Sequence, residues 1–211
     1  MTGRTEWELA TGARSLFDKG KQVRTMAVTG AGTEFDCLVD SALASSTNIQ
    51  AAGSNFFPSY RGITEALNDF AANSRTRCWA LVRPGTYSEG SVVHAFTGLN
   101  NVFLRGQTVG WQSNGRDCTW FPRSSVGFER FAVDGVSMSF ESVSAGISGT
   151  ELRLENARFF SPSSLTGDFS ISGTWIYASN CTFNSNSIGD LLIGAGSVLT
   201  GTSRLPVSSS T

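Results

Sequence analysis

Short stretches of alternating apolar and polar residues fill the C-terminal two-thirds of the chain. From about residue 118 onward, β-like runs of three to six residues follow one another, separated by Gly, Ser, Asn or Asp. A period of two is that of a strand with one buried face. No second helical pattern of useful length occurs in this region, so the pattern predicts an all-β domain.

Three of these runs share one form: two apolar residues two positions apart, a polar bend, and a further apolar residue. We interpret each as an inward-facing strand, a corner and the start of the next strand. Repeats of roughly 20 to 25 residues indicate a solenoid, so residues 76–205 are expected to supply around six coils. The aligned core positions are Met138 and Phe140, Leu152 and Leu154, and Trp175 and Tyr177.

Residues 62–74 carry the clearest helical pattern, with one apolar stripe along the helix. The end of a solenoid exposes apolar surface and unpaired backbone groups, and so needs a cover. This helix lies immediately before the first predicted strand, Cys78–Val82, and suits that role. The sequence therefore predicts a domain over residues 61–205 with a cap helix at 62–74, followed by a C-terminal tail at 206–211.

Residues 1–60 are predicted to form an N-terminal arm or accessory segment. Residues 1 to about 20 have a capping-box spacing and helical periodicity. Two strand-like stretches follow around a TGAGT turn. Aromatic and apolar residues in a segment without a core of its own need a surface to bury against, so the arm is where partner contacts are expected. The candidate partner-binding residues are Trp7, Leu16, Phe17, Phe56, Phe57 and Tyr60.

Composition narrows the function. Charged residues make up 16% of the chain, below the roughly 25% of typical domains. The net charge of −1 without a basic run argues against nucleic-acid binding. No apolar stretch is long enough for a membrane span, and no signal peptide is recognisable. The four cysteines are widely spaced without a CxxC motif, so we expect buried free thiols, no zinc, and folding in a reducing cytoplasm.

Candidate chemistry is sparse in the sequence. Glu141 and Glu155 follow aligned strand pairs, so they could form a carboxylate pair of the kind that cleaves glycosides. We favour a solvated ladder at a corner instead. The single histidine, His94, is interpreted as a structural residue. No serine has a GxSxG context. We expect no catalytic residues, no cofactor and no metal. Exposed tryptophans could stack on sugars, but we favour packing in the core or between subunits; the residues concerned are Trp79, Trp111, Trp120 and Trp175.

The helix ITEALNDFAAN, the strand CWALV and the turn Arg83–Tyr87 follow one another, and NVFLRGQ comes later. In this order the chain resembles the pectate-lyase-like, right-handed parallel β-helix superfamily, which includes phage tailspikes and virion proteins. The resemblance covers residues 61 to about 205. It departs from the family where Arg61-Gly62 replaces the Asp residues often found before the cap helix, and where the catalytic acids of the enzymes are missing.

The resemblance implies a short, right-handed parallel β-helix in a phage particle. The favoured function is a homotrimeric cement or decoration protein on the capsid exterior, made in the host cytoplasm, binding the major capsid protein or another virion protein. The small number of coils and the absence of acid–base signatures favour this class. The alternatives are a tailspike that degrades polysaccharide and a non-catalytic module that binds a receptor or glycan.

Overall fold

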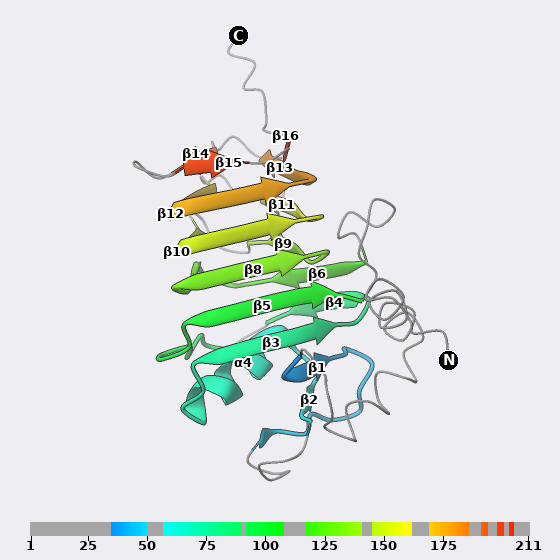
Figure 1. The fold of residues 1–211 in the computed structure, drawn as a ribbon. Helices are drawn as coiled ribbons and strands as arrows, with labels where there is room; N and C mark the ends of the chain where they lie inside the picture. The colour runs from blue at the N-terminus through cyan, green and yellow to red at the C-terminus, as the bar shows by residue number, and fades with distance from the viewer. Residues whose placement is uncertain are drawn as a thin grey trace, which may run out of the picture.

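The computed structural model describes residues 35–49, 57–89, 92–107, 117–140, 145–161, 169–185, 191–193, 198–200 and 203–204. These residues form two parallel β-sheets and one α-helix, α4 (Ile63–Ala72) (Figure 1). Sheet A contains β1 (Cys37–Val39), β2 (Ser59–Tyr60), β3 (Arg77–Val82), β5 (Asn101–Gly106), β7 (Val126–Gly127), β8 (Arg130–Asp134), β10 (Gly146–Glu155), β12 (Phe169–Ser179), β14 (Leu191–Ile193) and β15 (Val198–Thr200). Sheet B contains β4 (Gly85–Ser88), β6 (Cys118–Phe121), β9 (Ser137–Ser139), β11 (Arg158–Ser161), β13 (Cys181–Ser185) and β16 (Ser203–Arg204).

The chain passes back and forth between the two sheets. From β3 to β6, each strand of sheet A is followed by one of sheet B, and the same holds for β8 to β13. Every pairing between named strands is parallel. Figure 1 shows sheet A as a stack of strands with sheet B behind it. The prediction of an all-β domain is therefore confirmed for the described residues.

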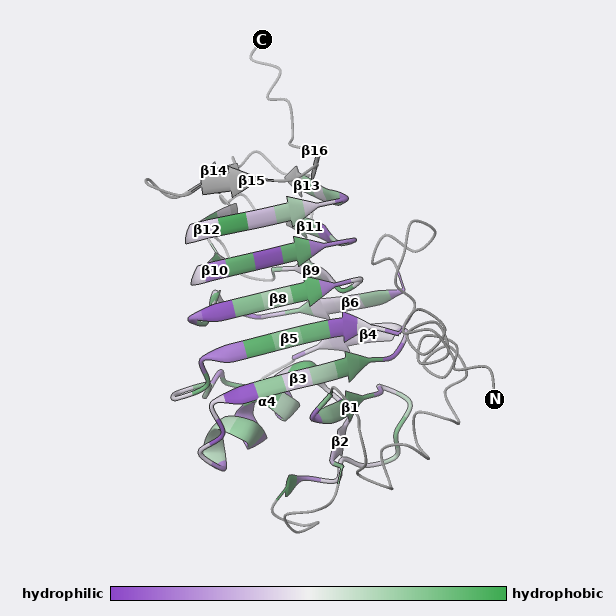
Figure 2. Ribbon diagram, viewed as in Figure 1, coloured by the Kyte–Doolittle hydropathy of each residue, from purple (hydrophilic) through white to green (hydrophobic). Residues whose placement is uncertain are grey.

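The core lies between the sheets and is built from aligned side chains. In sheet A, the inward positions of neighbouring strands pair directly and form two apolar columns (Figure 2). Such stacking removes each apolar side chain from water on both sides along the stack. The columns are Cys78, Val102, Phe131, Leu152 and Ile176, and Ala80, Leu104, Val133, Leu154 and Ala178. In sheet B, Trp120, Met138, Phe159 and Phe183 form a third column.

The predicted core register at residue 175 is wrong by one position. Ile176 pairs with Leu152 and is buried, whereas Trp175 and Tyr177 are 60% and 41% exposed. A shift of one residue reverses the face of every side chain in a strand. The sequence WIYA offers an apolar residue at both phases, so alternation alone could not choose between them.

The predicted alignment of Met138 with Leu152 is also wrong. Met138 pairs with Phe159 in sheet B, while the sheet A partner of Leu152 is Phe131. Both sheets use the same strand–corner–strand pattern, so a run from one sheet resembles a run from the other. It follows that Glu155, at the end of a sheet A strand, has no equivalent in Glu141, which follows a sheet B strand and lies outside the described residues.

The corners between sheets A and B repeat one backbone conformation. Gly135, Asn156 and Asn180 each follow a sheet A strand and have φ values of 73°, 50° and 51°. Glycine and asparagine are the residues that adopt this left-handed conformation most readily. The Nδ2 group of Asn180 donates to Oδ1 of Asn156 at 2.8 Å, so the corners are joined along the stack. Asn156 in turn donates to Asp134 at 2.8 Å.

The helix predicted at residues 62–74 is present as α4, Ile63–Ala72. It begins after Gly62, which is extended, and ends at Asn73. The Nδ2 group of Asn73 caps the C-terminus by donating to the carbonyl of Asp69 at 2.8 Å. The helix contacts β1, β2 and β3 (Figure 1). Its predicted apolar stripe is buried at Ile63, Ala66, Leu67 and Phe70.

The described part of the segment predicted as an arm belongs to sheet A. Strand β1 pairs with β3, and β2 pairs with β1. Cys37, Val39 and Tyr60 are buried in the main core. Packing is therefore continuous across residue 60, where the sequence suggested a boundary. The predicted helix at residues 1–20, the TGAGT turn and the tail at 206–211 lie outside the described residues.

All four cysteines are buried free thiols, which confirms that prediction. Burial raises the pKa of Cys118 to about 12 and that of Cys37 well above its usual range. Cys37 and Cys78 lie with their Sγ atoms 3.9 Å apart. Since the thiolate is the reactive form, neither burial nor protonation favours attack by a reagent in the folded state.

We expect the native protein to show no rapidly reacting thiol with Ellman's reagent near neutral pH, because all four sulfurs are buried. After denaturation, all four cysteines in the sequence should react. A spectrophotometric thiol titration with and without denaturant measures both values. One or more equivalents reacting immediately in the native sample would contradict this packing.

Candidate functional site

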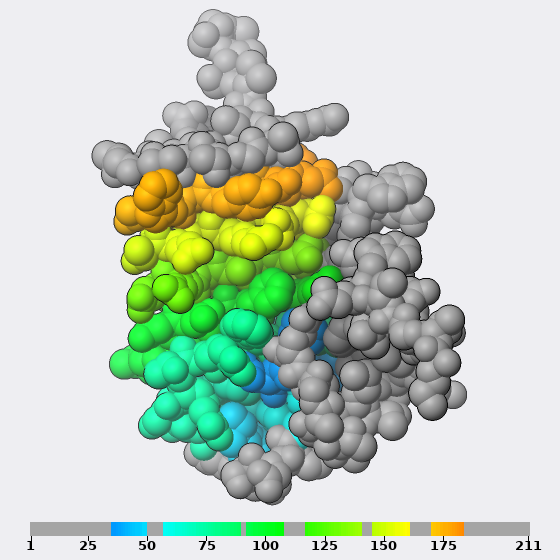
Figure 3. Space-filling view, viewed as in Figure 1, coloured from blue at the N-terminus to red at the C-terminus, as the bar shows by residue number. Residues whose placement is uncertain are grey.

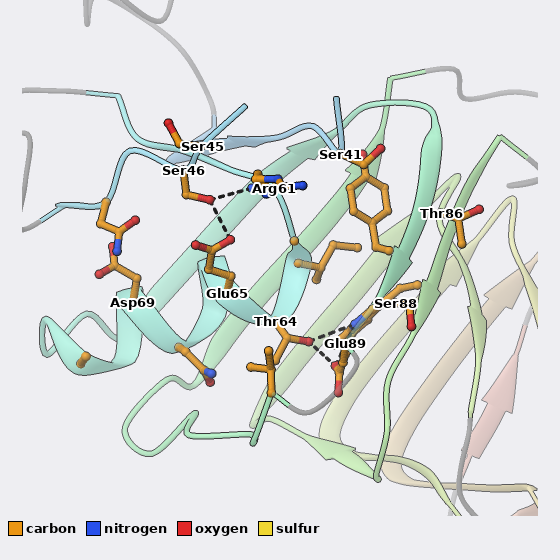
Figure 4. Close-up of a pocket in the computed structure, with 18 of the residues that line it drawn as sticks. Ser41, Ser45, Ser46, Arg61, Thr64, Glu65, Asp69, Thr86, Ser88 and Glu89 are labelled. Atoms are coloured by element: carbon orange, nitrogen blue, oxygen red, sulfur yellow. Dashed lines mark hydrogen bonds between the residues drawn. The ribbon is translucent and has the colours of Figure 1, made fainter. Parts of the chain in front are cut away.

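A polar cleft opens beside the cap helix. It has a volume of about 1100 Å³ and lies between the loop at residues 41–48, helix α4 and strand β4 (Figure 4). Ser46 holds the loop to the helix by donating to Glu65 Oε2 at 2.7 Å and accepting from the Arg61 amide at 3.0 Å. The backbone amide of Ile49 donates to Asp69 at 2.9 Å. These bonds fix one wall of the cleft to α4.

The other wall contains a buried carboxylate, Glu89. Its residue is 6% exposed and follows the end of β4. Oε1 accepts a hydrogen bond from the hydroxyl of Thr64 on α4 (Figure 4). It also accepts one at 3.0 Å from the indole nitrogen of Trp120 on β6. Oε2 accepts the backbone N–H of Arg123 at 2.9 Å. Glu89, which follows β4, therefore joins helix α4 to strand β6 and to the segment after β6.

His94 and Ser124 extend this network toward solvent. His94 Nε2 lies 2.6 Å from Glu89 Oε2, and His94 Nδ1 lies 3.0 Å from Ser124 Oγ. The imidazole stacks on Phe96, with ring centroids 4.7 Å apart, and Phe96 in turn packs on Phe128. His94 thus has hydrogen-bond partners at both nitrogens and a fixed ring plane.

The hydrogen bonds decide the charge of Glu89. Burial acts to raise the pKa of this carboxyl, but bonds from His94, Thr64 and the Arg123 amide outweigh burial and leave the pKa below its usual value. Glu89 is therefore ionised at neutral pH. This buried anion contacts helix α4, the segment between β4 and β5, strand β6 and the segment that follows β6.

We expect Glu89 to make folding sensitive to acid. A carboxyl whose pKa is lowered in the folded state stabilises the protein at pH values above its usual pKa of 4.5. This stabilisation is lost as the pH falls through the lowered pKa. The melting temperature of the wild type should therefore fall more steeply between about pH 5 and pH 3 than that of Glu89→Gln. Calorimetry of both proteins measures the two slopes. Parallel slopes would contradict the assignment.

A second candidate surface lies on the outer face of sheet A. Figure 3 shows this face over β8, β10 and β12. We define the ladder face as the outward-facing residues Arg130, Glu151, Arg153, Trp175 and Tyr177 of these strands. Arg130 pairs with Glu151 at 3.5 Å, and the Arg153 guanidinium lies 5.7 Å from the Tyr177 ring centre. Arg130, Glu151 and Arg153 side chains are more than 60% exposed. The face therefore combines aromatic rings with both signs of charge.

The outer face of sheet A is covered at β3. Phe35 and Leu38 pack against Leu81 on the outer side of β3, with Trp79 and Phe103 beside them. The Trp79 indole donates to Asn101 at 3.3 Å. The uncovered aromatic surface of sheet A is thus confined, among the described residues, to the ladder face.

The residues predicted to bind a partner lie in different environments. Tyr60 is fully buried and donates a 2.5 Å hydrogen bond to Asp69, which corrects the expectation that it contacts a partner. Phe57 is half-buried against the cluster around Leu81. Trp7, Leu16, Phe17 and Phe56 lie outside the described residues.

Of the candidate tryptophans, Trp120 is fully buried, Trp79 is half-buried and Trp175 is exposed, while Trp111 lies outside the described residues. The cluster of Glu89, His94 and Ser124 was not predicted from the sequence. Glu89 and His94 are close in sequence, but Ser124 reaches them only because β4 and β6 pair in parallel. The sequence does place Glu89 just after β4 and Ser124 soon after β6. That these residues lie close together follows only once the pairing of β4 with β6 is known.

Comparisons with protein-family models, curated proteins and solved structures find no match for this chain. No helix within the described residues is long and apolar enough to cross a membrane. The same residues contain no group of three His, Cys, Asp or Glu side chains placed to hold a metal ion.

Proposed function

We propose that this chain is a structural protein of a tailed-phage particle, built as a short right-handed parallel β-helix and assembled as a homotrimer. Three copies would pack side by side through the ladder face and bind the capsid exterior, where they stabilise the shell. The observation that carries the proposal is the exposed patch of Trp175 and Tyr177, flanked by charges of both signs, on a regular sheet face.

The spacing of paired strands supports the β-helix. Between Ala80, Leu104, Val133, Leu154 and Ala178, successive sheet A partners are 24, 29, 21 and 24 positions apart. Between these partners the chain visits sheet B, which is one coil of a solenoid. Parallel strands joined through a crossover are right-handed in about 98% of cases, which supports the proposed hand.

The chemistry of the ladder face supports self-association. Exposed aromatic residues and arginine are the types enriched at the centres of interfaces. Arg130 and Arg153 alternate with Glu151 and Glu155 along the face. A second copy presents the same two signs, so arginines of one copy can face carboxylates of the next. Such a pattern is self-complementary, whereas a strongly acidic or basic partner would meet like charges.

A second candidate is a module that binds a glycan. It is favoured by the same two rings, since Trp175 and Tyr177 are exposed and lie two positions apart on one face of β12. Apolar ring faces can stack on sugars. In that case the chain would bind polysaccharide as a monomer or oligomer, and Trp175→Ala would abolish binding without changing the solution mass.

Electron microscopy of the parent particle tests the proposed function. We expect the chain to form regular projections over the capsid shell, and particles that lack it should lose their contents at a lower temperature. Localisation at the tail would contradict a cement role and favour the glycan-binding alternative. Absence of the chain from purified particles would overturn both.

A further inference from the structure

We propose that Ser124, His94 and Glu89 form a serine-nucleophile site that hydrolyses small carboxylic esters. Ser124 would supply the nucleophile, His94 the general base, and Glu89 would act as the positioning residue. This activity goes beyond the assembly role and does not depend on it, because the three residues lie outside the ladder face.

The hydrogen bonds place the three groups in the order that acyl transfer requires. Ser124 Oγ lies 3.0 Å from His94 Nδ1, and His94 Nε2 lies 2.6 Å from Glu89 Oε2. A carboxylate accepts only, so it selects the tautomer with hydrogen on Nε2. Nδ1 then carries a lone pair directed at the Ser124 hydroxyl. Nucleophile and base in contact, with a third group orienting the base, are the general form of a serine catalytic site.

Glu89 positions both partners at once. Its Oε2 accepts from His94 and also from the backbone N–H of Arg123, the residue before Ser124. The Trp120 indole and the Thr64 hydroxyl fix Oε1. A carboxylate held by this many donors stays ionised, and the negative charge would stabilise an imidazolium formed on His94. One buried carboxylate therefore holds both the loop that carries Ser124 and the ring of His94 in place.

The general base His94 is largely buried, whereas the nucleophile Ser124 is open to solvent. The His94 side chain is 13% exposed, and its ring is held against Phe96. Asn68 on α4 ties down the loop beside it by donating to the Val93 carbonyl and accepting from the Ala95 amide. Ser124 is exposed, so an ester in solution can reach its hydroxyl.

The reaction balances without a cofactor. Ser124 Oγ bonds to the ester carbonyl carbon while its proton passes to His94 Nδ1. The C–O bond to the alcohol then breaks, and the alcohol leaves with that proton. Water oxygen next bonds to the acyl carbon while one of its protons passes to His94 Nδ1; the bond from this carbon to Ser124 Oγ then breaks, Oγ takes the proton back, and the carboxylic acid is released. Esters suit this site because an alkoxide leaves more readily than an amide nitrogen.

Covalent labelling of the full chain tests the nucleophile. A fluorophosphonate probe forms a bond from serine oxygen to phosphorus and releases fluoride. We expect one label per folded chain, located by mass spectrometry on the peptide containing Ser124, and no label on Ser124→Ala or on denatured protein. The exposed Ser148→Ala is the matched control and should label like the wild type. Labelling elsewhere, or none, would overturn the proposal.

Hydrolysis of 4-nitrophenyl acetate tests the base and the positioning residue. We expect Ser124→Ala and His94→Asn to lower kcat about 100-fold or more, while their melting temperatures show whether each variant is folded. Glu89→Gln should lower kcat with KM unchanged when the rate is expressed per folded chain, with the folded fraction measured by circular dichroism, so that unfolded protein does not count as lost catalysis. A folded Ser124→Ala that keeps the wild-type rate would show imidazole catalysis alone and would overturn the site. The result leaves the assembly proposal untouched, since that is read from solution mass.

Discussion

Replacing Phe131 with alanine is expected to lower the free energy of unfolding by about 3–5 kcal/mol. Phe131 is 1% exposed and occupies the middle of an apolar column, between Val102 and Leu152 on the neighbouring strands. Its ring lies 5.4 Å from that of Phe128. Truncation removes the buried ring and leaves a cavity that the strands on both sides, held by backbone hydrogen bonds, cannot close.

The adjacent residue supplies the control. Arg130 precedes Phe131 on the same strand, but its side chain is 63% exposed and pairs with Glu151 at the surface. Exposed ion pairs contribute about 0–1 kcal/mol, so Arg130→Ala should unfold close to its parent when both variants are made in the Trp175→Ala/Tyr177→Ala background, which removes the proposed contact between copies. Urea denaturation followed by circular dichroism measures both. Equal losses in the two variants would mean that the strand does not have the described inward register.

Replacing Glu89 with alanine is expected to cost about 3 kcal/mol, because it leaves donors without an acceptor at a buried position. The Arg123 amide and the Thr64 hydroxyl lose their bonds to the carboxylate. Trp120 retains a 3.2 Å bond to Thr64 Oγ1, which limits the loss. His94 also loses its partner at Nε2.

Glu129→Ala is the matched control for this variant, since Glu129 is an exposed carboxylate. A surface truncation of this kind changes stability by no more than about 0.5 kcal/mol. Urea midpoints of both variants, measured at neutral pH, decide the point. If Glu89→Ala unfolded at the same midpoint as Glu129→Ala, the network around Glu89 would not hold the cap helix to the stack.

The sequence was sufficient to predict the elements whose apolar pattern fits only one secondary structure and one buried face, such as helix α4. The stripe of α4 fits one face of a helix, and the burial of its apolar residues follows. The strand at Cys78 begins directly after the cap, as its apolar run suggests. The predicted repeat of roughly 20 to 25 residues is close to the 21 to 29 positions that separate paired residues of sheet A. In these cases local pattern and tertiary packing agree.

The sequence was insufficient where two solutions share one pattern. WIYA is apolar at both phases, so only pairing with β10 assigns Ile176 to the core and Trp175 to the surface. Met138 could belong to either sheet until its pairing with Phe159 was known. The long-range partners of Glu89 lie 25 to 34 positions from it in the sequence, and no local motif predicts their contact. Long-range pairing therefore decided both the exposed face and the buried network.

The mass of the protein in solution tests the ladder-face account most directly. Light scattering at micromolar concentration should give three times the chain mass of 22.5 kDa. The double variant Trp175→Ala/Tyr177→Ala should give a single chain mass with unchanged circular dichroism, because it removes only exposed rings. Val93→Ala, at a residue 77% exposed outside the ladder face, should remain trimeric. A wild-type mass of one chain, or a double variant that remains trimeric, would contradict assembly through this face.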